Sequence, residues 1–344
     1  MKVTLQQIAD TVGVSKMTVS LYLRDKNTTR VSSILKKQIE DALTSLGYVP
    51  PVSSGSDSTN RVIGIFIPFA HPFFKYELVN TYLIGIQQEL VSRNYSMMFL
   101  NRQNSHDGML VDKKTLDLAK TCRGIIIFGT RDTTKVSLQG IVDIFNKNDI
   151  PVTVLNSPSH INNALQGFTV NDTNCNPVQY LISLGHKRIL FMGGSFDAFH
   201  TQEKIDEYRT ILSKNGIEVS DELIVEGDFE SYSAYTALKR KIEDGVKFTS
   251  VYSISTQMCV GCYRALHEGG YRIPEDVSVV NYGDPYFIEF LNPALTAVHL
   301  PLEELGRSLT AKLVGLIEKG RKHITGEVVM PNKLSVRNST SSIR

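Results

Sequence analysis

The sequence has few cysteines and lacks long apolar runs, and each absence excludes a class of protein. Four cysteines in 344 residues do not make a disulfide framework, which fits a reducing compartment. No run of about 18 uncharged apolar residues is present, which excludes a membrane-spanning helix. The first residues, MKVTLQQIADTVGV, contain no uninterrupted apolar stretch and no small-residue cleavage site, so we expect no secretory signal peptide. Together these absences predict a cytoplasmic protein.

Motifs that mark common enzymes and metal centres are also missing. There is no GxGxxG, no Walker P-loop and no GxSxG, and no nucleophile–base pair is visible. Cys259 and Cys262 have CxxC spacing, but a second pair of zinc ligands is missing, so we interpret them as structural cysteines. We therefore predict that the chain is not an enzyme and that it uses no metal or cofactor.

Composition divides the chain into a head, a linker and a body. The 344 residues allow two or three domains, and the apolar fraction of 42% is enough to build real cores. Residues 1–50 are helical in pattern, and residues 51–60, PVSSGSDSTN, have the composition of a flexible linker. Six of the seven basic residues in positions 1–60 lie between Lys16 and Lys37, with one acid among them. A small basic head on a neutral body indicates a module that binds a polyanion, although a solvated helical face has the same composition.

The body alternates between short apolar runs and helix-length amphipathic segments. The apolar runs occupy residues 62–68, 96–100, 124–128, 152–155, 189–192, 223–225, 251–254 and 277–280. Buried strands that alternate with helices predict parallel sheets covered on both faces. Residues 61–334 are long for one sheet, so we predict an α/β body of two doubly wound parallel-sheet lobes, the second beginning near Cys175, followed by a tail at 335–344. A ligand would sit between the lobes, at the carboxyl ends of the strands.

The head is predicted to contain three short helices. Thr4 caps a first helix that Gly13 ends, and Ser15 caps a second. A third helix follows Ser32. Two short helices joined by a tight turn with a glycine form a helix-turn-helix, so the head is predicted to be a small all-α helix-turn-helix domain.

The head segments VTLQQIADTVGVSKMTVSLYL and VSSILKKQIEDALTSLGYVP carry a more specific signal. They follow the spacing VTxxDVAxxAGVSxxTVSxxL and VSxxTRxxVxxAxxxLGYxPN, and on these residues the chain resembles the LacI/GalR family of bacterial transcription regulators. LGHKRI at 184–189 and IPEDVSVVNYG at 273–283 extend the resemblance into the body. The resemblance implies a periplasmic-binding-protein-like body. It also implies a homodimeric repressor at the bacterial nucleoid, which binds a palindromic operator in double-stranded DNA and is modulated by a small molecule.

The resemblance implies DNA-binding residues on and around the second helix of the head. Lys16 and Met17 would lie at base edges in the major groove, with Leu21 one turn further on. Leu21 stands where many family members have an Arg, so the operator sequence cannot be copied from them. Core packing is the alternative role for Met17 and Leu21, whereas nearby hydroxyl groups suit contacts to phosphate. The expected DNA-binding residues are Thr4, Ser15, Lys16, Met17, Thr18, Ser20, Leu21 and Val52.

The linker is the largest departure from the family pattern. The family usually continues with NxxAxxLxxG, a hinge helix whose Leu wedges into the minor groove. Residues 51–60 contain no Leu, and their Gly, Ser and Pro disfavour a helix, which leaves Val52 as the single apolar candidate for a wedge. This atypical hinge leaves a second interpretation open, a small-molecule-binding protein with weakened or non-specific DNA binding.

The resemblance also implies an effector site between the lobes, at positions that have changed. Lys204 stands where the family usually has an Arg, and Ser255 and Thr256 replace the Asn and Asp of the family's AND motif. Only Asp284 remains of two family aspartates. Two interpretations stay open: an anionic or more apolar metabolite in place of an ordinary sugar, or weakened effector control. The expected effector contacts are Phe73, Phe74, Phe168, Lys204, Tyr208, Ser255, Thr256 and Asp284.

Overall fold

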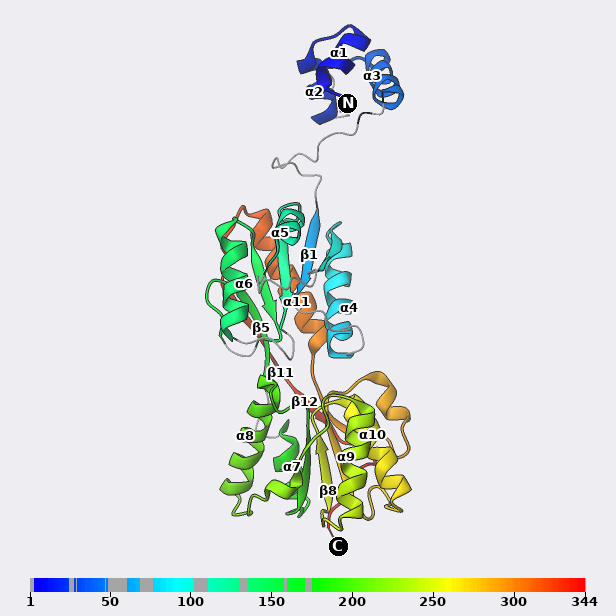
Figure 1. The fold of residues 1–344 in the computed structure, drawn as a ribbon, viewed down its shortest axis with the longest axis vertical. Coiled ribbons are helices and arrows are strands. Elements are labelled where there is room, and N and C mark those ends of the chain that lie inside the picture. The colour runs from blue at the N-terminus through cyan, green and yellow to red at the C-terminus, as the bar shows by residue number, and fades with distance from the viewer. Residues whose placement is uncertain are drawn as a thin grey trace. The chain divides into compact units, whose positions relative to one another are not determined.

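The computed structural model describes most of the chain. The described residues are 3–24, 28, 30–46, 48, 61–68, 77–101, 111–129, 135–157, 160–170 and 175–343. They belong to two compact units, a head within residues 1–57 and a body within residues 58–344 (Figure 1). Within the described ranges, no helix is both long enough and apolar enough to span a bilayer. Three of the expected site residues, Val52, Phe73 and Phe74, lie outside the described residues.

The head consists of α1 (Leu5–Val12), α2 (Lys16–Arg24) and α3 (Ser33–Ser45). A capping box starts α1, because the Thr4 hydroxyl accepts from the Gln7 N–H and the Gln7 side chain accepts from the Thr4 N–H at 2.8 Å. Gly13 follows α1 with φ +73°, a left-handed conformation that glycine adopts without strain, and it turns the chain toward α2. The Ser32 hydroxyl accepts from the Leu35 N–H and starts α3. The head therefore has the three helices that the sequence predicts.

The head has a small core of its own. Its buried apolar residues come from all three helices and from the segment before α3: Ile8, Ala9, Val19, Tyr22, Val31, Ile39 and Ala42. The Tyr22 hydroxyl donates to the Glu40 carboxylate at 2.6 Å and joins α2 to α3. Core packing and this hydrogen bond together fix the face that α2 presents to solvent.

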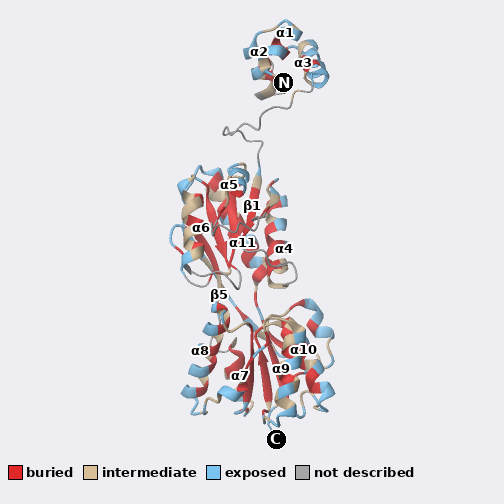
Figure 2. Cartoon of the chain, in the orientation of Figure 1, coloured by how far each residue is buried: buried red, intermediate tan, exposed pale blue. Residues whose placement is uncertain are grey.

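The first lobe of the body is built on a six-stranded parallel sheet with the order β11–β5–β4–β3–β1–β2. Its strands are β1 (Val62–Ile67), β2 (Ser96–Asn101), β3 (Gly124–Phe128), β4 (Val152–Leu155), β5 (Leu165–Val170) and β11 (Gly326–Pro331). Its helices are α4 (Glu77–Ser92), α5 (Lys113–Ala119), α6 (Lys135–Lys147) and α11 (Leu302–Glu318). Strands β1, β3 and β4 are almost wholly buried (Figure 2), which explains why their sequences are continuous apolar runs.

The second lobe is built on a second six-stranded sheet with the order β12–β10–β9–β8–β6–β7. Its strands are β6 (Ile189–Gly193), β7 (Ile224–Glu226), β8 (Ser250–Ser253), β9 (Ser278–Tyr282), β10 (Thr296–His299) and β12 (Lys333–Ser335). Its helices are α7 (Pro177–Ser183), α8 (Phe199–Lys214), α9 (Ser231–Glu243) and α10 (Thr256–Glu268), with short 3-10 helices at Asp221–Leu223 and Tyr286–Phe290. The pairs are parallel except for β12, which runs antiparallel to β10. The predicted α/β body of two parallel-sheet lobes is confirmed.

The chain passes between the two lobes three times. The first crossing follows β5, the second joins β10 to α11, and the third joins β11 to β12 through Asn332. Helix α11 and strand β11 therefore belong to the first lobe, although they follow β6 to β10 in the sequence.

Two glycines let α4 and α11 pack closely in the first lobe. Gly85 of α4 faces the backbone of Glu303, and Gly306 of α11 faces the carbonyl oxygen of Tyr82, which a Cβ would approach to 2.6 Å. A side chain at either position would collide with backbone atoms of the other helix. Three leucines of α11, Leu305, Leu309 and Leu313, are buried in the core of this lobe, and Leu316 packs against it.

The segment 335–343, which the sequence sets apart as a tail, is bound to the second lobe. The Ser339 hydroxyl donates to the Val279 carbonyl at 2.6 Å and accepts from the Thr296 N–H at 2.8 Å. Ser339 is completely buried. Its hydroxyl thus satisfies one backbone donor and one backbone acceptor inside the lobe.

Ser339→Ala is expected to lower the free energy of unfolding by about 1–3 kcal/mol, because a buried N–H and a buried carbonyl each lose a partner. Urea unfolding measures this change. Ser213→Ala, at an exposed position of α8, is the matched control and is expected to change stability by less than about 0.5 kcal/mol. Equal stability of the two variants would show that the Ser339 hydroxyl contributes nothing to the lobe.

Candidate functional site

The first turn of α2 is open to solvent. The Ser15 hydroxyl caps this helix by accepting from the Thr18 N–H at 3.1 Å, and it lies 2.9 Å from the Thr18 hydroxyl. Lys16 and Ser20 are exposed, and Met17 is 79% exposed. Met17 therefore lies outside the head core, and the core-packing alternative does not hold for it.

The side chains of Leu21 and Thr4 are already engaged within the head, unlike those of Lys16 and Met17. Leu21 is half-buried and packs against the head core, so the core-packing alternative holds for it in part. Thr4 is exposed, but its side chain takes part in the capping box of α1. The first turns of α1 and α2 contain no acidic residue, so no carboxylate of those turns competes for an anion there. Both helix starts suit contact with phosphate groups.

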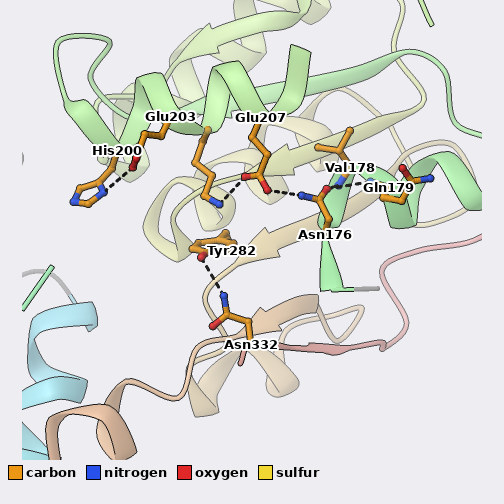
Figure 3. A network of polar contacts seen from close by, with 9 residues as sticks. Asn176, Val178, Gln179, His200, Glu203, Glu207, Tyr282 and Asn332 are labelled. Atoms are coloured by element: carbon orange, nitrogen blue, oxygen red, sulfur yellow. Dashed lines mark hydrogen bonds and ion pairs between the residues drawn. The ribbon is translucent and has the colours of Figure 1, made fainter. Parts of the chain in front are cut away.

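Lys204 of α8 is paired with Glu207, which belongs to a polar network of the second lobe (Figure 3). Its ammonium lies 2.7 Å from Glu207 Oε2 and 4.3 Å from the centroid of the Tyr282 ring. Burial acts to lower the pKa of Lys204, but Tyr282 and the Glu207 carboxylate outweigh burial and hold the pKa above its usual value. Lys204 is therefore charged at neutral pH and already has an anionic partner.

Tyr208 is not the polar contact that the sequence analysis expects, and that prediction is wrong. The side chain is completely buried in the core of the second lobe, and its ring centroid lies 5.4 Å from that of Phe191. Its hydroxyl donates to the Ile189 carbonyl at 2.7 Å, and burial raises the pKa of Tyr208. The physical reason is helix geometry, because Tyr208 shares the buried face of α8 with Ile205 and Leu212.

Ser255 and Thr256 lie where β8 ends and α10 begins. Ser255 occupies the N-cap position of α10, and its side chain makes no capping hydrogen bond there. Thr256 is buried, and its hydroxyl accepts from Asn281 Nδ2 at 2.9 Å. The Asn281 amide also donates to the Gly283 carbonyl at 2.7 Å, so the carboxyl ends of β8 and β9 are joined at this point.

Asp284 follows β9 and is paired within the second lobe. Its side chain is only 7% exposed, and its Oδ1 lies 2.8 Å from Nη2 of Arg337. His299 Nδ1 lies 3.9 Å from the other carboxylate oxygen. No sequence signal points to Arg337, because the two partners are far apart in the chain and no local pattern connects them. The Asp284 carboxylate therefore already forms an ion pair with Arg337.

Phe168 and Glu77 belong to the first lobe. Phe168, an expected effector contact, is half-buried on β5. Glu77, the first residue of α4, was not expected. Burial and, after it, the like charge of Asp284 raise the pKa of Glu77 to about 7. Two carboxyl groups from different lobes therefore repel each other, which no local sequence pattern indicates.

Two family models match the chain. The model described as periplasmic binding protein-like domain matches residues 178–340, and the model described as bacterial regulatory proteins, lacI family, matches residues 4–51. The chain therefore combines a lacI-family head with a periplasmic-binding-protein-like domain. The lacI-family match falls on the helix-turn-helix head, and the other match falls within the body.

Known transcription regulators match along most of the length of this chain. It is 27% identical over 313 residues to the ribose operon repressor of Escherichia coli (strain K12), covering 88% of this chain and 89% of that relative. It is 25% identical over 356 residues to the HTH-type transcriptional repressor PurR of Vibrio campbellii, covering 99% of both. Both relatives are transcription regulators rather than enzymes.

Solved structures share the fold of this chain. A lac repressor dimer bound to operator and the anti-inducer ONPF superposes with a TM-score of 0.70, with 20% identity over 99% of this chain and all of that one. A complex of the transcriptional regulator CelR with cellobiose gives 0.67, with 24% identity over 98% of this chain and all of that one. At this identity the likeness establishes the head-and-two-lobe architecture.

Proposed function

We propose that this protein is a LacI-family transcriptional repressor and not an enzyme, and that it binds a palindromic operator as a homodimer in the bacterial cytoplasm. The observation that carries the proposal is the open first turn of α2. Lys16 and Met17 project from the head, while Val19 on the same helix is buried. A helix fixed by its inner face and exposed at its first turn has the geometry of a recognition helix in the major groove.

The exposed residues of the head divide into two roles. Lys16 donates to guanine O6 and N7, and Met17 contacts a thymine methyl group. The hydroxyls of Ser15, Thr18 and Ser20 contact phosphates and set the register of the head on the duplex. Two heads on a two-fold axis then read successive major grooves, with centres about 34–36 Å apart if the half-sites are one turn apart.

Footprinting on genomic DNA tests this function. A repressor of this kind protects a palindrome with two half-sites, and the protection disappears more slowly with salt than binding to unrelated sequences does. Equal binding to every sequence at all salt concentrations would instead support the alternative, a small-molecule-binding protein without specific DNA recognition.

The homodimer needs an apolar surface, and the second lobe exposes one. In the 3-10 helix Tyr286–Phe290, Tyr286 is 83% exposed and Phe290 is 76% exposed. Monomeric proteins rarely leave neighbouring large aromatic side chains in water. We assign this aromatic patch to the contact between two copies of the chain.

Phe290→Glu is expected to weaken the dimer by at least about tenfold in Kd, because a carboxylate would replace an aromatic side chain at the centre of the contact. Sedimentation velocity across a concentration series measures the change. Val136→Glu, which places a carboxylate on the exposed face of α6 in the first lobe, is the control and is expected to leave the dimer intact. If the Phe290 variant and the unmodified protein sedimented identically, the dimer interface would not include this aromatic patch.

We further propose that a small molecule controls the repressor from the region between the lobes. Lys204, Ser255, Thr256, Asp284 and Phe168 are the described residues that we assign to this region. Their chemistry supports control by a population shift, in which a ligand that prefers one arrangement of the lobes changes the affinity of the heads for DNA.

A further inference from the structure

The Lys204 ammonium is satisfied from within the protein. Its side chain is 20% exposed, and the partly exposed Glu207 carboxylate accepts from it at 2.7 Å. Tyr282 covers it from another direction at 4.3 Å. An anionic partner stabilises such a lysine, because a largely buried charge without a partner costs folding free energy. Glu207 supplies that partner in the structure described here.

Glu207 also reaches the start of the second lobe. Its other carboxylate oxygen, Oε1, accepts from Asn176 Nδ2 at 2.6 Å (Figure 3). Asn176 is the N-cap of α7, where its Oδ1 accepts from the N–H groups of Val178 and Gln179 at 2.9 and 3.1 Å. One carboxylate thus joins Lys204 to the first helix after the first crossing between the lobes.

The same network extends to the third crossing. Asn332 Nδ2 donates to the Tyr282 hydroxyl at 3.3 Å (Figure 3). The Asn332 N–H donates to the Val170 carbonyl at 2.8 Å, and Cys175 Sγ donates to the Asn332 carbonyl at 3.2 Å. Hydrogen bonds therefore hold the first and third crossings together, next to the Tyr282 ring that covers Lys204.

We propose that Glu207 is an internal stand-in for the anionic group of a ligand, a carboxylate or phosphate that binds Lys204 by displacing Glu207 and so loosens Asn176 at the first crossing. This proposal rests on the proposed control of the repressor by a small molecule. It names the chemical class of that molecule and the contact through which the ligand reaches the crossings.

The exchange is physically balanced. Lys204 keeps one anionic partner before and after, so the buried charge is never left alone. The displaced Glu207 carboxylate is partly exposed and can turn to water. A neutral ligand has no means of replacing Glu207, because it offers Lys204 no charge. Glu207 is tethered one helical turn from Lys204, so it competes at high effective concentration and keeps small anions weak in the unmodified protein.

Glu207→Gln tests the displacement in the full-length protein. Isothermal titration calorimetry with inorganic phosphate, and separately with acetate, is run at constant ionic strength. The variant is expected to bind at least one of these anions about tenfold more tightly than the unmodified protein, because the competing charge is gone. A gain with phosphate alone or with acetate alone identifies which anionic group the site prefers.

Two variants control this experiment. Glu203 lies on the same helix as Glu207, and its carboxylate pairs with His200 at 3.8 Å. Glu203→Gln is expected to change anion affinity by less than about threefold. Lys204→Met combined with Glu207→Gln is expected to abolish the gain. The proposal is overturned if Glu207→Gln binds neither anion more tightly, or if the double variant keeps the gain. Neither result depends on operator binding, so failure here leaves the footprinting test unaffected.

Reactivity of the Cys175 thiol reports on the crossings. A Cys122→Ser background leaves Cys175 with two other cysteines, Cys259 and Cys262, and both of these are completely buried. Labelling of Cys175 by a thiol reagent is expected to be several-fold faster in Glu207→Gln than with Glu207 present. An unchanged labelling rate would overturn the link between the carboxylate and the crossings.

Discussion

Lys16→Ala is expected to weaken operator binding by about 1–3 kcal/mol while leaving binding to unrelated DNA nearly unchanged. The Lys16 side chain is exposed at the start of α2, where the Ser15 cap holds the helix end in place. A donor that contacts a base edge contributes to discrimination between sequences, whereas a donor that contacts phosphate contributes equally to all of them. Fluorescence anisotropy with operator and scrambled duplexes at one fixed salt concentration measures both affinities.

Lys37→Ala is the matched control for Lys16→Ala. Lys37 is exposed on α3, the helix that follows the helix-turn-helix pair. Any contribution of this lysine is expected to be electrostatic and equal for the two duplexes. If Lys16→Ala also weakened both duplexes equally, Lys16 would be a phosphate contact, and recognition would rest on other residues of α2.

Gly85→Ala is expected to destabilise the first lobe by about 3 kcal/mol or more, since the added carbon meets a rigid backbone in a packed interior. A Cβ at Gly85 would overlap the carbonyl oxygen of Glu303 in α11. Neither helix can yield locally, because Gly306 of α11 is also in close contact with the backbone of Tyr82 in α4. The two helices would have to separate and expose apolar surface. Urea unfolding followed by circular dichroism measures the loss.

Gly315→Ala is the control for the close helix contact. Gly315 lies in α11, and a Cβ there would meet no atom within 4 Å. In a helix interior alanine is favoured over glycine, so this variant is expected to gain up to about 1 kcal/mol of stability. If Gly85→Ala kept wild-type stability, α4 and α11 would be able to move apart at no cost, and the close contact at Gly85 and Gly306 would not limit their packing.

The strands of both sheets could be predicted where burial is continuous. Strands β3, β4 and β6 are buried along their whole length, and β1 is buried at every position after Val62, so each appears in the sequence as an apolar run. Strand β11 is exposed or half-buried at every position, and its sequence, GEVVMP, does not stand out. It is a strand because β5 offers it a free edge, which is a property of the fold and not of those six residues.

The candidate site was predicted less well than the fold. The family resemblance assigned Lys204 and Asp284 to one region, but it did not reveal that each of these charges already has a partner within the second lobe. Glu207 and Arg337 are the partners, and only three-dimensional proximity identifies Arg337. The Tyr208 prediction failed for another reason, because its spacing of three and four residues from Ile205 and Leu212 puts it on the buried face of α8.

The triple passage of the chain between the lobes has a consequence for how this protein is made. A ribosome that has released the polypeptide as far as β10 has delivered every helix of the second lobe, but neither α11 nor β11 of the first. The half that starts earliest is therefore completed late, with its apolar helix α4 still lacking its partner. Premature termination or a late frameshift would leave that half open, which makes the final forty or so codons as decisive for its assembly as the early ones.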